Sequence, residues 1–143
     1  MLRFTGSLST SFEALALFVS EKYTYTNKKN ILSASIVQKI DSFLHKIKNK
    51  ESNEGIVSFD ISNTQKCFII KVNKKHETYF PQECGGNFYS YLKKIKDIKK
   101  LDFYPDSLDF EKEELSRFFS KFIFGFNLKS YTFNKYKTLK KEK

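Results

Sequence analysis

Several residue types that support specialised chemistry are scarce in this chain. Its 143 residues include no tryptophan, two histidines, two cysteines, five glycines and two prolines. Two cysteines are too few for a disulfide-stabilised scaffold, and two histidines are a small stock for a transition-metal site. The low glycine and proline content excludes a collagen-like or low-complexity chain.

Long apolar runs are missing as well. The stretch Ala14–Val19 has only six residues and follows Glu13, whereas a secretory signal needs roughly 7–15 apolar residues and a membrane span about 20. We therefore expect no membrane association and a cytoplasmic location. In that compartment Cys67 and Cys84 stay reduced.

The chain is strongly basic but poor in arginine. Its 26 Lys and Arg against 16 Asp and Glu give a net charge of +10, yet Arg3 and Arg117 are the only arginines. Arginine is the better phosphate ligand because its planar guanidinium binds two oxygens at once. The lysine excess therefore indicates solubility and weak attraction to polyanions.

One lysine cluster stands beside aromatic residues, a combination typical of single-stranded nucleic-acid binding. A solvated helix end in a lysine-rich chain explains the same cluster more simply. The candidate nucleic-acid contacts are Lys93, Lys94, Lys96, Lys99 and Lys100.

Hydrophobic periodicity predicts an alternation of strands and helices. The predicted elements are a buried strand at Ala14–Val19, a helix from Ser33 or Ser35 to Lys48, a hairpin of Gly55–Ile61 and Lys66–Val72, a loop at Asn73–Gly86, a helix at Asn87–Ile95, a strand at Ile98–Tyr104 and a long helix from Ser107 or Asp109 through Phe126. This order predicts one α/β domain with a mixed sheet flanked by helices.

Motifs for catalysis or phosphate binding are weak. The chain has neither a Walker loop nor a G-x-G-x-x-G sequence. Gly85-Gly86, predicted to open a helix, could hold an anion through backbone N–H groups, although a plain turn is the simpler interpretation. The acidic residues between Asp102 and Glu114 suit a helix start better than a cation site.

Two cysteines remain as possible nucleophiles. His76, Glu77 and Cys84 share one predicted loop, but their spacing matches no zinc motif, and a polar surface loop is the simpler interpretation. A Cys84–His76 pair stays open as an alternative. Cys67, between apolar strand residues, is expected to be a small buried side chain.

The C-terminal segment carries a more specific pattern. Residues 125–137 read G-F-N-L-K-S-Y-T-F-N-K-Y-K, which resembles the segment E-G-x-x-L-x-S-Y-x-F-D-x-Y-K closing the N-terminal domain of M17-family leucyl (cytosol) aminopeptidases. Phe124 stands at the usual Glu, and Asn134 at the usual Asp.

The resemblance implies a macro-domain-like three-layer sandwich that is not itself an enzyme. Residues 1–128 would form a non-catalytic domain, and 129–143 a basic exit segment leading to an absent catalytic domain. That domain would hold two divalent metal ions, zinc or manganese, and the parent would be a homo-hexameric hydrolase that removes N-terminal amino acids from peptides. No catalytic, cofactor-binding or metal-binding residue is expected in these 143 residues.

Two other functions stay open. One is a nucleic-acid-binding module with weak DNA binding, which uses the lysine cluster defined above. The other is a macro-like pocket for ADP-ribose or another phosphorylated ligand, an idea that rests on fold analogy alone. The absence of a glycine-rich phosphate loop makes this last possibility the weakest of the three.

Overall fold

The chain divides into two compact units in the computed structural model. One comprises Met1–Lys74 and Asp97–Phe110, and the other Lys75–Lys96 and Glu111–Lys143. The structure describes residues 2–3, 13–27, 32–49, 55–73, 79–95 and 101–141, with the backbone alone for 2–3, 49 and 132–141.

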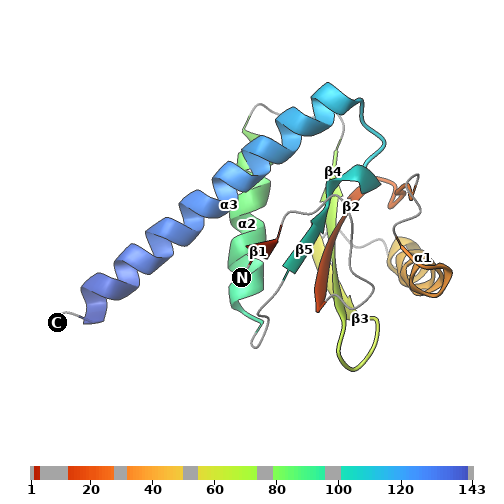
Figure 1. Cartoon of the computed structure of the whole chain (residues 1–143), viewed down its shortest axis with the longest axis horizontal. Coiled ribbons are helices and arrows are strands. Elements are labelled where there is room, and N and C mark those ends of the chain that lie inside the picture. Colours follow the sequence, from red (N-terminus) through yellow and green to blue (C-terminus); the bar gives the residue numbers. More distant parts are fainter. Residues whose placement is uncertain are drawn as a thin grey trace. The chain divides into compact units, whose positions relative to one another are not determined.

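The first unit is built on a five-stranded mixed sheet (Figure 1). Its strands are β1 (Leu2–Arg3), β2 (Ala14–Ser20), β3 (Ile56–Asp60), β4 (Lys66–Val72) and β5 (Leu101–Tyr104), arranged in the order β1-β5-β2-β4-β3. Strand β2 is parallel to both β4 and β5, whereas β3 is antiparallel to β4. The predicted buried strand and the predicted hairpin are thus confirmed.

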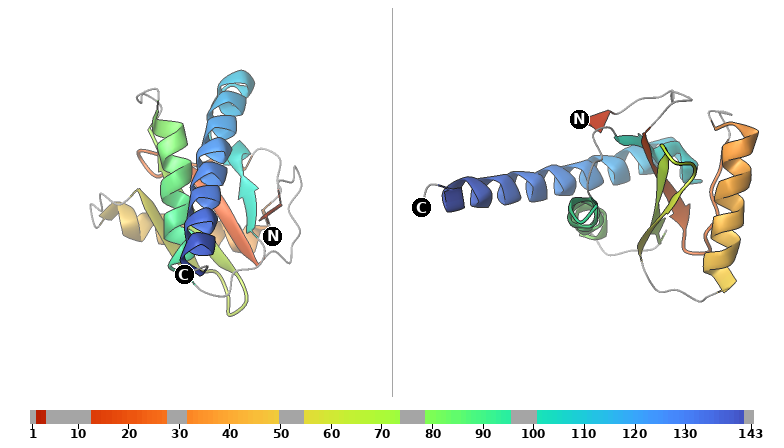
Figure 2. Two further views of the ribbon diagram at one scale, coloured as in Figure 1. Left: turned by 90° about the vertical axis from the view of Figure 1, so that its left-hand side faces the viewer. Right: turned by 90° about the horizontal axis from the view of Figure 1, so that it is seen from below.

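The central position of β2 explains its composition. It has a strand on each side, and its residues from Ala14 to Val19 are fully buried. Helix α1 (Ala34–Asn49) covers one face of the sheet (Figure 2), where Ile40 and Leu44 pack in one cluster with Leu15 and Leu17. A strand buried on both faces carries a continuous apolar run rather than alternation.

Helix α1 begins where the sequence predicts. The backbone N–H of Ile36 donates to Ser33 Oγ at 3.3 Å, so Ser33 is the cap of the helix. The predicted end near Lys48 also agrees with the observed end at Asn49.

The second unit is a pair of helices, α2 (Phe80–Lys93) and α3 (Lys112–Lys141), which lie side by side (Figure 2). The ring of Phe88 contacts those of Phe122 and Phe126, each at a centroid distance of 6.0 Å. Phe118, Phe122 and Phe126 are buried, at the four-residue spacing of one helix face, which agrees with the predicted helix through Phe126.

Two glycines set how closely α2 and α3 approach. A Cβ atom added to Gly85 would overlap the carbonyl oxygen of Phe122, and one added to Gly125 would overlap that of Gln82. Both obstacles are backbone atoms, which cannot rotate aside. Glycine is therefore required at these two positions for the helices to cross at this separation.

The prediction of a loop up to Gly86 was wrong. Helix α2 begins at Phe80, with Pro81 in its first turn, and Gly85-Gly86 lie inside it. Proline is well tolerated at a helix start because its missing N–H is not needed there. Gly85 serves helix packing, so the idea of an anion site at a helix opening loses its basis.

The start of the last helix was also misplaced. Residues Pro105–Ser107 form a short 3-10 helix, η1, and α3 begins at Lys112. Ser107 does not cap α3 because its hydroxyl is bonded inside the sheet instead. The helix continues through Lys129 to Lys141, past the boundary drawn at residue 128.

No helix in the part of the chain that the structure describes is long and apolar enough to cross a membrane.

We predict opposite effects for neighbouring glycines. Gly85→Ala and Gly125→Ala should each destabilise the protein by about 1–3 kcal/mol, because the new methyl group meets backbone. Gly86 is the matched control: its nearest neighbours would lie 3.7 Å away, so Gly86→Ala should stabilise α2 by up to about 1 kcal/mol through helix propensity. Urea unfolding measures all three, and equal effects would contradict the packing argument.

Candidate functional site

A hollow of the first unit lies where its parallel strands end. It has a volume of about 440 Å³ and lies beyond Ser20 and Val72, the last residues of β2 and β4, and beside the segment that follows β5. We call it the cleft. Its lining residues are Ser20, Glu21, Lys22, Thr24, Tyr25, Thr26, Val72, Leu108, Asp109 and Phe110.

The topology of the sheet makes this place special. The chain leaves β2 for β3 and β4 on one side, and later returns to β5 on the other side of β2. The strand order therefore reverses at β2. Open α/β sheets bind ligands in the crevice outside the carboxyl ends of the strands at such a reversal.

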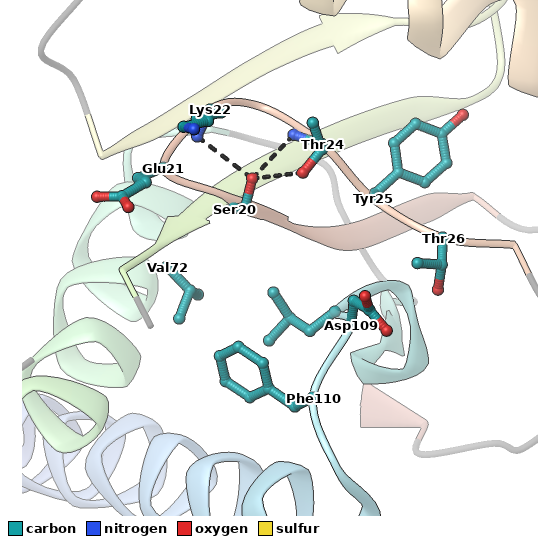
Figure 3. A pocket seen from close by; sticks show the side chains of 10 residues that line it. Ser20, Glu21, Lys22, Thr24, Tyr25, Thr26, Val72, Asp109 and Phe110 are labelled. Atoms are coloured by element: carbon teal, nitrogen blue, oxygen red, sulfur yellow. Dashed lines mark hydrogen bonds between the residues drawn. The ribbon is translucent and has the colours of Figure 1, made fainter. Parts of the chain in front are cut away.

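Ser20 organises the upper wall of the cleft (Figure 3). Its Oγ accepts hydrogen bonds from the backbone N–H groups of Lys22 (3.2 Å) and Thr24 (3.1 Å) and also bonds the Thr24 hydroxyl. This arrangement fixes a tight turn, in which Tyr23 adopts a left-handed conformation with φ of 62°. A residue with a large side chain rarely adopts this conformation, and such strain concentrates at functional sites.

The second half of the turn is tied to the segment after β5. The backbone N–H of Thr26 donates to the Ser107 carbonyl at 2.8 Å, and the Thr26 hydroxyl donates to the Asp106 carbonyl at 3.0 Å. The phenol of Tyr104 donates to Asn27 Oδ1 at 3.2 Å. The two walls of the cleft are thus joined at one end before any ligand arrives.

Ser107 anchors this junction in the core. It is fully buried, and its Oγ accepts from the backbone N–H of Phe18 at 3.0 Å. Its hydroxyl hydrogen lies within reach of the carbonyl oxygens of Phe18 (2.7 Å) and Tyr104 (2.8 Å). One side chain therefore fixes the point at which β5 leaves β2.

The lining of the cleft carries more negative than positive charge. Glu21 and Asp109 are acidic and Lys22 is basic, which gives a formal charge of 1 − 2 = −1. Carboxylates accept hydrogen bonds from sugar hydroxyls and amino groups, while the lysine offers a cation to a phosphate. Val72 and Phe110 add an apolar surface (Figure 3).

The residues singled out in the sequence lie elsewhere. Lys93 and Lys94 are exposed at the end of α2, and the Lys93 ammonium lies 5.4 Å from the centre of the Tyr89 ring. Lys96, Lys99 and Lys100 lie outside the described residues. The structure therefore does not test the cluster as a whole.

The cysteines are core residues. Cys67 is buried in β4 as expected, and Cys84 is buried in α2 rather than placed on a surface loop. Burial raises the pKa of the Cys84 thiol to about 12, so almost none is thiolate at neutral pH, and the idea of a nucleophilic pair is not supported. His76 and Glu77 lie outside the described residues.

No group of three or more potential metal-ligating side chains occurs among the residues that the structure describes. Of the acidic residues at Asp102–Glu114, Asp102 is buried in β5 and Asp109 lines the cleft.

Sequence reasoning missed the cleft. The polar residues Glu21–Asn30 belong to no predicted helix or strand, and Asp109 and Phe110 lie at the predicted start of the long helix. The available signal was positional: a polar stretch directly after a buried, continuous apolar strand marks the carboxyl edge of a parallel sheet.

Comparison with known proteins supports the fold and leaves the family open. No family model matches the chain, and no curated protein matches it. Among solved structures, the macrodomain of DarG from Thermus aquaticus matches with a TM-score of 0.57 and 13% sequence identity, over 85% of this chain and 89% of that one. The fold is macrodomain-like. The predicted α/β fold class with a mixed sheet is thus confirmed.

The resemblance to leucyl aminopeptidases was wrong. The match to a solved structure is with a macrodomain, and the segment that carried the resemblance lies within α3. There Gly125 is explained by its approach to α2, whereas Leu128 and Tyr131 are 48% and 65% exposed. A helix that packs through one glycine can therefore show this sequence pattern in a protein unrelated to the aminopeptidases.

The expected function was wrong for the same reason. A macrodomain neighbour conflicts with an accessory domain of a metal-dependent aminopeptidase or hydrolase. The two-metal centre and the hexamer rested on that resemblance alone. The alternative function in nucleic-acid binding gains no support from the comparison either.

We predict that Ser107→Ala destabilises the protein by about 1–3 kcal/mol, because it removes the buried hydrogen bonds between the Ser107 hydroxyl and the Phe18 backbone. Ser120, exposed on α3, is the matched control, and Ser120→Ala should change stability by less than about 0.5 kcal/mol. Thermal and urea unfolding compare the two. A Ser107→Ala protein as stable as the control would contradict the anchoring role.

We also predict a loss of stability in alkali. Burial raises the thiol pKa of both Cys84 and Cys67 above the ordinary value of 9.0, so above about pH 9 the unfolded chain releases thiol protons that the folded chain keeps. The free energy of unfolding should fall as pH rises from about 9 towards 12. Cys84→Ala, compared with wild type by urea unfolding across this range, should show a shallower decline, and an equal slope would refute the assignment.

Proposed function

We propose that this chain is a macrodomain-like binding module whose cleft takes a ligand of the ADP-ribose class. The observation that carries the proposal is the position of the cleft at the carboxyl ends of β2, β4 and β5 in a fold similar to a macrodomain. A volume of about 440 Å³ lies within the usual range for small-molecule sites.

The lining offers different groups to the nucleoside and to the diphosphate of such a ligand. Glu21 and Asp109 can accept hydrogen bonds from ribose hydroxyls or an adenine amino group, and Phe110 offers a ring on which a base can stack. Lys22 is the cation of the lining that can bind the diphosphate. The backbone N–H groups of Lys22 and Thr24 are already bonded to Ser20, so phosphate recognition rests on the side chain of Lys22.

The charge of the cleft favours the nucleoside end of the proposed ligand over its diphosphate end. A cleft with a formal charge of −1 repels a dianionic diphosphate and accepts a neutral nucleoside without that cost. The nucleoside end therefore supplies most of the affinity, and adenosine should compete with ADP-ribose for the cleft.

The proposal includes a cytoplasmic location. Cys67 and Cys84 are free thiols, which agrees with a reducing compartment.

Isothermal titration with ADP-ribose and with adenosine tests the proposal. We expect saturable binding of both, and a Phe110→Ala variant should bind about tenfold more weakly because base stacking on an aromatic ring is lost. Phe124 on α3, 58% exposed and absent from the cleft lining, provides the matched control.

Phe124→Ala should leave both affinities unchanged. Absence of heat with either ligand at millimolar concentration would overturn the proposal. Equal losses in the two phenylalanine variants would place the ligand somewhere other than the cleft.

A further inference from the structure

A second hollow lies between the turn after β2 and helix α1. Its volume is about 300 Å³, and we call it the groove. Lys22, Thr24 and Tyr25 line both the groove and the cleft, so the turn is a wall shared by two hollows. The groove is lined by Lys22, Tyr23, Thr24, Tyr25, Asp41, Leu44, His45 and Lys48.

The groove has the opposite charge to the cleft. Lys22 and Lys48 are cations and Asp41 is the acidic residue of the lining, which gives a formal charge of 2 − 1 = +1 with His45 neutral. The cleft, on the same count, carries −1. An anion is therefore attracted to the groove and repelled from the cleft, although the two share Lys22.

The acidic residue of the groove already has a hydrogen-bond donor within the protein. The phenol of Tyr25 donates a hydrogen bond to Asp41 Oδ1 at 2.8 Å, and in Figure 3 this hydroxyl points away from Phe110 and the cleft. Burial, and then the contact with Asp41, raise the pKa of the Tyr25 phenol, so it remains a donor at neutral pH. This bond weakens Asp41 as a competitor for the lysines.

The remaining walls are firm. The Tyr23 backbone is held in a left-handed turn. The Lys71 ammonium lies 5.3 Å from the centre of the Tyr23 ring. Leu44 is buried in the core below the groove. His45 adds an N–H donor from the same helix face as Asp41 and Lys48, since residues three, four and seven positions apart share a face.

We propose that the groove binds the terminal phosphate of a small phosphate monoester. Two ammonium groups match the double negative charge of a monoester, the histidine donates to a third oxygen, and a volume of about 300 Å³ admits a sugar phosphate rather than a polymer. The groove does not require the ligand proposed for the cleft, although the two hollows share Lys22.

Titration of the ¹⁵N-labelled full-length chain with ribose 5-phosphate, followed by NMR at constant ionic strength, tests the site. Saturable shifts are expected in the backbone amides of 22–25 and 41–48, and ribose and sodium chloride should not produce them. His45→Gln and Lys48→Gln should each weaken binding by about two- to threefold. Both positions are exposed and neither lines the cleft.

Two further variants make the test specific. Lys46→Gln removes the same charge from the same helix, but Lys46 is absent from the groove lining, so affinity should be unchanged. Asp41→Asn keeps an oxygen for Tyr25 and removes the negative charge, so affinity should rise by about two- to threefold.

Three outcomes would overturn the site: shifts no larger than those with sodium chloride, an equal loss in Lys46→Gln, or tighter binding of a phosphodiester oligonucleotide than of ribose 5-phosphate. Phe110→Ala separates the two proposals, because it should weaken ADP-ribose binding and leave the phosphate shifts intact.

Discussion

The cleft depends on the hydrogen bonds that the Ser107 hydroxyl makes. The register of β2 and β5 ends at Leu17 and Tyr104, and the next residue of β2, Phe18, is still fully buried with its backbone N–H and carbonyl within reach of Ser107 Oγ. Ser107 satisfies both. Because a buried unpaired backbone group is costly, this side chain lets β5 leave the sheet early and places Leu108, Asp109 and Phe110 beside the end of β2.

The same junction positions the other wall. The carbonyl of Ser107 accepts from the backbone N–H of Thr26, and the carbonyl of Asp106 accepts from the Thr26 hydroxyl. The turn after β2 is therefore fixed at both ends, by Ser20 at its start and by η1 at its finish. A wall held in this way loses little conformational entropy when a ligand binds, so more of the contact energy appears as affinity.

Much of the fold follows from patterns visible in the sequence. The apolar run at Ala14–Val19 identified the central strand, and Ser33 together with the spacing of Ile36, Ile40 and Leu44 identified α1. These signals are reliable because burial on both faces of a strand requires a continuous apolar run. Burial along one side of a helix requires apolar residues three or four positions apart. The start of α2 escaped prediction because Gly85 and Gly86 look like loop residues, whereas Gly85 is required by contact with Phe122, a residue 37 positions away in sequence (122 − 85).

The site escaped prediction for a related reason. Ser20, Thr26 and Ser107 matter through hydrogen bonds to distant backbone groups, which no local motif announces. The C-terminal pattern of Gly125, Leu128 and Tyr131 misled because a helix that packs through one glycine can reproduce a family motif while leaving the other two residues exposed.

The turn Ser20–Asn27 also separates charge. It places Glu21 in the cleft and Tyr23 in the groove, and Lys22 lines both hollows. A lysine side chain is long and flexible, so one ammonium can serve only one hollow at a time. An anion held in the groove therefore withdraws the cation from the cleft and makes the cleft more negative. Occupancy of the groove should then favour neutral ligands in the cleft over phosphorylated ones, and by linkage a phosphorylated ligand in the cleft should weaken the groove by the same factor.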